Sequence, residues 1–148
     1  MSFSITVDVS DAIRALQTLE SEFDEAVEEA LSEYEQEFVN QIKGNIQAQG
    51  LVETGRMRDS VSAEVRKSAE GFEGEVSIDV EYATTHEFGA VINSSGDKPL
   101  AFQNEDGNWV YSDKVVVPAR PFVTPVVENL GDQLEEFIGT RVQKRLVL

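Results

Sequence analysis

Few residues in this chain could carry out chemistry. His86 is the only histidine and stands next to Glu87, a pair that could act in a hydrolase as a general base and its orienting carboxylate. A single histidine without any cysteine does not make a typical zinc site, and no spacing suggests a Ser-His-Asp arrangement or a glycine-rich phosphate loop. We therefore expect no catalytic residue, no metal and no cofactor, and a hydrolase that uses His86 and Glu87 stays an alternative.

The composition is strongly acidic. The 148 residues include 28 acidic and 12 basic side chains, for a formal net charge of −16. Such a surface should not bind nucleic acid non-specifically, because phosphate binding needs Lys and Arg. Two explanations remain: adaptation to very high salt, or a specific acidic face that mimics DNA or lines a path along which DNA slides. The acid excess is spread along most of the chain, which favours the first.

The remaining bulk properties limit the class of protein. No apolar run is long enough to cross a membrane, and the first residues do not look like a secretory signal, so we expect no membrane partner. The absence of cysteine excludes disulfides and leaves the redox compartment undetermined. The length predicts one domain, 1–148.

The N-terminal half predicts one long helix. Residues 3–9 alternate in polarity like a short strand. From Ser10 to Gly50 apolar residues then recur at steps of three and four, which predicts an amphipathic helix of about 50 Å that ends at Gly50. Between Glu20 and Glu37 lie nine carboxylates and no basic residue. We expect a solvated acidic face that destabilises the helix at low salt.

The second half predicts strands followed by a helix. Residues 61–65 and 76–80 alternate and predict an antiparallel hairpin, and 100–103 with 109–117 predict a second one. Between them, 82–89 is long enough for only one helical turn. Thr124 is expected to cap a last helix that carries Arg141, Lys144 and Arg145 near its end. The expected fold class is α+β, a mostly antiparallel β-sheet with a long N-terminal helix and a C-terminal helix.

Three of the seven arginines stand in short motifs. Arg56 and Arg58 follow the Thr54-Gly55 turn, and if the next strand begins there they point to the same side. Arg120 lies between Ala119 and Pro121, just before the last helix. We expect these arginines to meet specific carboxylates, either within the chain or on a neighbouring subunit.

The motifs resemble a known family when they are taken in order. They are Thr54-Gly55-Arg56-Met57-Arg58-Asp59-Ser60-Val61, then Tyr82-Ala83 with His86-Glu87-Phe88-Gly89, then Pro118-Ala119-Arg120-Pro121-Phe122. Their order and spacing resemble those of the head–tail connector (neck or tail-completion) proteins of long-tailed phages and related viruses. Met57 stands where that family usually has Leu, and the segment from Val91 to Val117 is long.

The resemblance implies a structural virion protein that forms a ring in the neck and joins the DNA-filled head to the tail. It implies a hexamer, with twelve subunits as the second choice, between a neck or head-completion protein and a tail-tube or tail-terminator protein. Viral DNA would pass through without specific binding. The protein would lie in the virion neck, and in the host cytoplasm during assembly, and its acidity suggests a halophilic host.

Four residues are expected at subunit interfaces, and three are expected to face the channel. The interface residues are Arg56, Arg58, Arg120 and Phe122. The channel residues are Glu25, Glu29 and Glu33, because carboxylates do not hold a passing polyanion. The alternative function is an acidic DNA mimic that inhibits a nucleic-acid-binding enzyme, supported by the run from Glu20 to Glu37.

Overall fold

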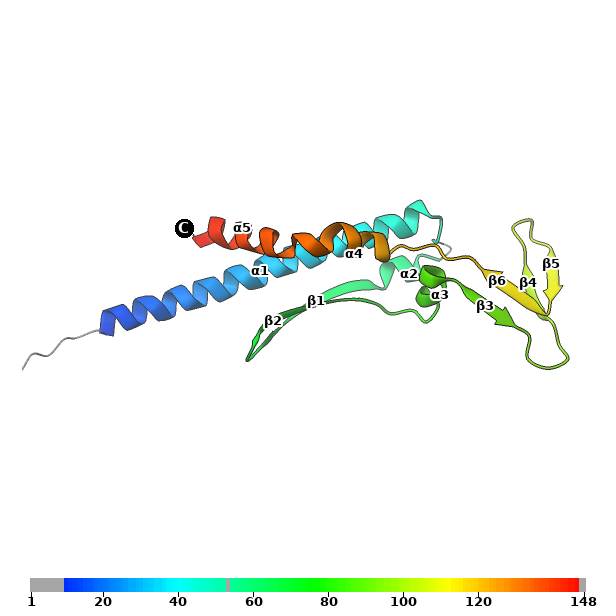
Figure 1. Ribbon diagram of the computed structural model, residues 1–148, viewed down its shortest axis with the longest axis horizontal. Helices are drawn as coiled ribbons and strands as arrows, with labels where there is room; N and C mark the ends of the chain where they lie inside the picture. The colour runs from blue at the N-terminus through cyan, green and yellow to red at the C-terminus, as the bar shows by residue number, and fades with distance from the viewer. Residues whose placement is uncertain (1–9, 53, 147–148) are drawn as a thin grey trace, which may run out of the picture.

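One helix, α1 (Ser10–Ala48), forms the long axis of the protein, and the other elements pack along it or extend from its C-terminal end (Figure 1). The computed structural model describes residues 10–52 and 54–146. The strand expected for residues 3–9 lies outside them. The β1–β2 hairpin packs on one side of α1, and α4 and α5 pack on another. The α+β class predicted from the sequence is therefore confirmed.

The C-terminal end of α1 forms where the sequence predicts it. Gly50 has a φ of 67°, in the left-handed region. Its N–H donates to the carbonyl of Gln47, and the N–H of Leu51 donates to the carbonyl of Ile46. This pair of bonds is a Schellman motif, which satisfies the last carbonyls of a helix and needs a residue without a Cβ at the left-handed position.

The first hairpin also follows the prediction. Strand β1 (Val61–Ser68) pairs antiparallel with β2 (Gly71–Ile78). The face that carries Val65, Val76 and Ile78 is partly buried, whereas the opposite face carries the charged residues of both strands except Lys67. The alternation of the sequence therefore sets which face covers α1.

The residues after the hairpin differ from the expectation of a single second hairpin. Ala90–Asn93 (β3) pairs with Lys114–Val117 (β6), and Leu100–Gln103 (β4) pairs with Trp109–Ser112 (β5). The strand predicted for 109–117 is interrupted at Asp113, where the Ser112 hydroxyl donates to the carbonyl of Lys114. The described strands thus form three separate antiparallel pairs. Residues 90–117, here named the arm, project away from the helices (Figure 1).

The C-terminal helix is divided in two. It consists of α4 (Thr124–Leu130), a 3-10 turn (Gly131–Gln133) and α5 (Leu134–Leu146). The interruption begins at Gly131, a residue with low helix propensity. Apolar spacing continues across it from Val127 to Phe137, which is why the sequence predicts a single helix.

The core lies where α1, α2 (Arg56–Asp59), α3 (Ala83–Phe88) and α4 meet. Its fully buried side chains are Phe122, Ile42, Ile46 and Val126. Tyr34 borders this core, packs its ring on Phe137 and donates its hydroxyl to the carbonyl of Leu130. A buried phenol needs such a partner, so this bond fixes the end of α4 on α1.

A buried carboxyl lies under the hairpin. Glu35 is 5% exposed, and its Oε1 has no hydrogen-bond partner among the described residues. Burial raises the pKa of Glu35, and the backbone N–H of Glu75 opposes the shift. A Cβ at Gly74 would lie 2.0 Å from this oxygen. A side chain at position 74 would therefore have to displace the Glu35 carboxyl from its place between α1 and β2.

Candidate functional site

The turn at Thr54-Gly55 leads into a short helix and not directly into a strand. Gly55 has a φ of 78°, as expected for a glycine turn, and α2 follows it. Arg56 and Arg58 are therefore on a helical turn, where residues two apart point to nearly opposite sides. The prediction that both point to the same side of a strand is wrong. Met57, between them, is buried in the core.

Both arginines of α2 have a carboxylate partner in the same chain. Arg56 lies 3.6 Å from Glu81, and Arg58 lies 2.8 Å from Asp59. The Arg56 and Glu81 side chains are mostly exposed. Exposed ion pairs of this kind contribute little to stability, so Arg56 and Glu81 are both available to a further partner.

Glu87 joins the second motif to the third. Its carboxylate accepts hydrogen bonds from the backbone N–H groups of Phe122, Val123 and Thr124 and from the Thr124 hydroxyl, at 2.5 to 2.9 Å. The side chain is only 6% exposed. The N-terminal end of α4 is thus capped by Glu87 from α3, and the expected cap by Thr124 itself is wrong.

The electrostatics of Glu87 follow from these contacts. Burial by itself would raise the pKa of Glu87, but the bonds from Thr124, Val123 and Phe122 together hold the pKa below its ordinary value. The carboxylate therefore stays ionised and is occupied by four donors. His86 instead packs edge-to-face on Tyr82, with ring centres 6.0 Å apart. The geometry does not bring His86 and Glu87 together as a base and its orienting carboxylate.

Gly89 and the His86 backbone complete this junction. A Cβ at Gly89 would lie 2.8 Å from the carbonyl oxygen of Val117 and 2.9 Å from the backbone nitrogen of Ala119. The backbone N–H of Arg120 donates to the carbonyl of His86 at 2.7 Å. The segment around Gly89 therefore lies directly against the segment that returns from the arm, and only glycine permits this approach.

The third motif separates into an exposed residue and a buried one. Arg120 is exposed, and within the described part of the chain no carboxylate pairs with it, although the six other arginines each form an ion pair. Phe122 has no exposed surface and belongs to the core. The sequence suggested both as interface residues, and the structure leaves only the Arg120 side chain accessible.

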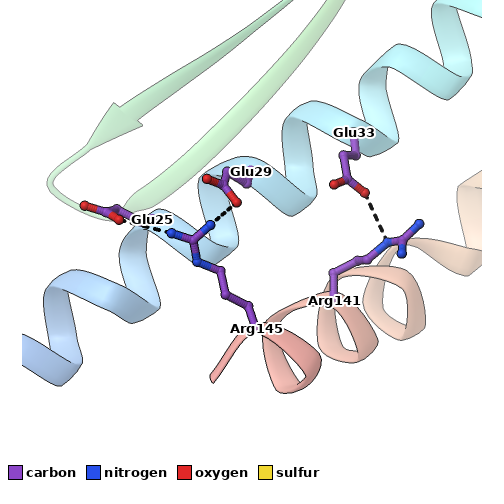
Figure 2. Close-up of polar contacts among 5 residues, drawn as sticks. All are labelled: Glu25, Glu29, Glu33, Arg141 and Arg145. Carbon is purple, nitrogen blue, oxygen red and sulfur yellow. Dashed lines mark hydrogen bonds and ion pairs between the residues drawn. The ribbon is translucent and has the colours of Figure 1, made fainter. Parts of the chain in front are cut away.

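The expected channel residues lie between two helices. Arg145 of α5 contacts Glu29 and lies 3.2 Å from Glu25, and Arg141 lies 3.1 Å from Glu33 (Figure 2). Glu25, Glu29 and Glu33 keep more than half of their side-chain surface exposed. The acidic face of α1 is thus not an unrelieved row of like charges, because α5 supplies cations that the stretch from Glu20 to Glu37 lacks.

Small residues allow α5 to reach this face. Ala26 and Ala30 of α1 are buried against Val142 of α5. Because alanine adds little bulk, the two helices approach closely, and the arginines at the border of the contact reach the glutamates. On the other side of α1, Lys67 of β1 pairs with Asp24 at 2.5 Å.

Two kinds of feature are absent from the described residues. No three or more acidic or histidine side chains are grouped so that they could hold a metal ion. None of the described helices combines the length and apolar character needed to span a bilayer.

We predict that Glu87→Gln lowers the stability at pH 7 by about 2 kcal/mol or more, because charged hydrogen bonds are lost and one amide N–H₂ faces backbone donors. Thermal unfolding measures this as a Tm lower by about 5 °C or more. Since the folded pKa of Glu87 is lowered, its stabilisation is present above the ordinary carboxyl pKa of about 4.3 and fades as the pH falls through the folded value. The difference in Tm between Glu87→Gln and the unaltered protein should therefore shrink as the pH falls. Glu128→Gln, exposed on α4, is the control. Equal losses of Tm in the two variants would contradict the role of Glu87 in capping α4.

We also predict that the Tm rises as NaCl increases from about 0.1 M to the molar range, where the Debye length falls to roughly 3 Å. Screening weakens the repulsion from 16 net negative charges more than it weakens a few exposed ion pairs. Changing Glu20, Glu22 and Glu37 to Gln removes carboxylates of α1 for which the described structure shows no ion pair, and should make the salt dependence shallower. A flat or falling Tm in the unaltered protein would contradict the prediction.

Comparison with known proteins identifies the family. The model of the family described as "Bacteriophage HK97-gp10, putative tail-component" matches residues 10–89, which hold α1, α2, the first hairpin and α3. No curated protein and no solved structure matches the chain significantly. The match covers more than half of the chain. The chain therefore belongs to the HK97-gp10-like family of phage tail components and is a structural protein of the virion.

Proposed function

We propose that this protein forms a ring in the virion neck that joins the DNA-filled head to the tail and lets the genome pass. The observation that carries this proposal is that the three sequence motifs meet at one place in the fold. Glu87 and the Arg120 backbone tie the second motif to the third, and Met57 of the first is buried in the same core. A tail component whose motifs build one fixed support at the base of a projecting arm is suited to hold neighbouring subunits in a set geometry.

Arg120 is the residue at this support that we assign to the subunit interface. Its backbone is fixed by the bond to His86, and its exposed guanidinium has no ion pair among the described residues. A guanidinium binds a carboxylate through two parallel hydrogen bonds and so fixes orientation as well as distance. In a chain with 28 acidic residues, a carboxylate of the next subunit is the natural partner. Arg56 and Arg58 are proposed to support the same contact.

We further propose that the acidic face of α1 borders the DNA path. Glu25, Glu29 and Glu33 stay more than half exposed beside Arg141 and Arg145, so their excess of negative charge remains towards solvent. Lys and Arg in excess along the channel would hold DNA by releasing its counterions, whereas an excess of carboxylates would not.

Six subunits is the ring size that we propose, with twelve as the second choice, between a head-completion or neck protein and a tail-tube or tail-terminator protein. The acidic surface fits a virus of a halophilic host. A DNA mimic would need an uninterrupted row of carboxylates, and in this chain Arg141 and Arg145 of α5 lie between three of the central ones and partly neutralise them. The structure therefore gives the mimic no specific support.

Arg120→Ala should block head–tail joining while changing the Tm of the subunit by no more than the small amount typical of exposed positions. Electron microscopy of particles that carry the variant should show filled heads and free tails. Arg66→Ala is the control, because Arg66 is an exposed arginine already paired with Glu64 and Glu75. If Arg120→Ala particles join normally, or the variant unfolds with the loss expected for a core residue, the interface role is wrong.

A charge exchange tests the channel position. Changing Glu25, Glu29 and Glu33 to Lys together with Arg141 and Arg145 to Glu keeps the pairing between α1 and α5 but puts lysines on α1. If α1 borders the channel, the lysines should bind DNA and slow genome ejection, measured as the rate of DNA release. Glu70→Lys, in the β1–β2 turn, changes the net charge by the same +2 and serves as the control. Normal ejection from particles shown to contain the exchanged variant would contradict the channel position.

A further inference from the structure

Exposed large apolar side chains gather on two separate surfaces of the described chain. Six of the twelve lie on the arm, including Trp109 at 62% and Tyr111 at 67% exposure. Four others, Phe23, Phe88, Val127 and Leu134, lie along α1, α3, α4 and α5, and the remaining two are on the first turns of α1. Contiguous exposed apolar surface on a soluble protein usually marks a contact site.

The second surface is a groove. Its floor is α1, one wall is β2 and the other wall is formed by α4 and α5. The groove has a volume of about 840 Å³ and is lined mainly by apolar side chains such as Phe23, Phe38, Phe72 and Val127. A smaller hollow, which shares Val127, continues it to α3 and Phe88. The space between hairpin and helices is therefore large, apolar and open.

The arm carries an aromatic face that has no packing partner among the described residues. Trp109 pairs with Gln103 and Tyr111 pairs with Ala101 across β4 and β5, so the two aromatic rings share one face of the ribbon. A two-stranded ribbon is at best marginally stable alone in water and gains stability by packing on a further surface. Figure 1 shows that the arm extends from one end of the protein, whereas β2, α5 and the start of α1 lie towards the other end.

The two surfaces also resemble each other in carrying few charged residues. Strands β4 and β5, LAFQ and WVYS, contain no charged residue, although 27% of the chain is charged. The only charged residues that line the groove are Glu35 and Glu73. Two copies with 16 net negative charges each can therefore make contact here without bringing many carboxylates together.

We propose that the aromatic face of the arm, with Trp109 and Tyr111, packs into the groove of a second copy of this chain, at Val127 and Leu134. The inference rests on the proposed ring and names the surfaces that would build it. Because the two surfaces differ, the contact is head-to-tail, and such contacts close into a ring when the rotation between subunits closes. Buried aromatic side chains commonly supply most of the affinity of an interface.

A disulfide cross-link tests the contact, since the chain has no native cysteine. The double variant Tyr111→Cys with Val127→Cys is oxidised in assembled neck particles and, as purified protein, in molar salt. A bridge needs Cα atoms about 4.4–6.8 Å apart, so only docked surfaces should react. We expect a ladder of covalent multimers on a denaturing gel, up to the number of subunits in the ring. Tyr111→Cys with Ser62→Cys, on the outer hairpin face, is the control and should stay monomeric.

Each other result overturns the proposal. Dimers without higher multimers would mean that arms pair with arms, and an internally bridged monomer would mean that the arm folds back on its own groove. Unlinked monomers from complete particles would mean that another protein, or residues 1–9, fills the groove. In these cases the ring function can still hold, whereas absence of the protein from the neck would reject the function itself.

The affinity gives a second measurement. Trp109→Ala should weaken self-association in molar salt by about 30-fold or more, as for a central aromatic anchor. Sedimentation measures this change, and Glu105→Ala in the turn of the same hairpin is the control. Trp109 is the only tryptophan, so its emission should also move to shorter wavelength as the unaltered protein assembles. An unchanged association constant for Trp109→Ala would overturn the contact.

Discussion

The buried carboxylate of Glu87 is the group on which the rest of the structure depends. It accepts hydrogen bonds from three backbone N–H groups at the start of α4 and from the hydroxyl of Thr124. Glu87 therefore caps α4, for which no side chain at the helix start forms a cap. A helix start buried without such a partner would leave several donors unsatisfied. By holding residues 122–124, Glu87 also directs the ring of Phe122 into the core. One ionised side chain thus sets both the local geometry and the packing.

The same clamp fixes the base of the arm. Gly89 precedes the first strand of the arm, and Ala119 follows the last one. The two lie in backbone contact, and the Arg120 N–H bonds to the carbonyl of His86. The start and the end of the arm are therefore both fixed next to α3. This arrangement explains how Glu87, Gly89 and Arg120, which belong to motifs far apart in the sequence, meet in the fold.

The sequence predicts the elements with regular periodicity and misses what depends on tertiary contacts. The long helix, its end at Gly50 and the first hairpin follow from apolar spacing and glycine chemistry. The break at Asp113 does not, because both halves of the predicted strand alternate and only pairing with different partners separates them. Local propensity likewise gave no reason to divide the last helix at Gly131, because its apolar spacing is continuous.

The predicted site residues show the same division. The motif singles out Arg120, whose interface role stays a prediction. The role of Glu87 does not follow from the sequence, because nothing in a sequence tells whether a carboxylate turns inwards. The sequence also carries a signal for the pairing of α5 with α1. Arg141 and Arg145 are four residues apart, as are Glu25, Glu29 and Glu33, and matched helical spacing of opposite charges is what two packed helices need. Arg141 and Arg145 therefore do more than complement the dipole at the C-terminal end of α5: they also pair with α1.

The scarcity of cations gives these pairs their structural importance. With 12 basic residues against 28 acidic ones, the cations are too few to pair with every carboxylate. Several of the described arginines join separate elements, whereas Arg14 and Arg58 pair within their own helices. Arg141 and Arg145 hold α5 along α1, and α1 is a continuous 39-residue helix that links the groove to the support of the arm. A helix of this length spans about 58 Å and bends only gently. The separation of the two apolar surfaces is therefore set by a stiff element, and a ring built through them would take its radius from α1 and not from flexible loops.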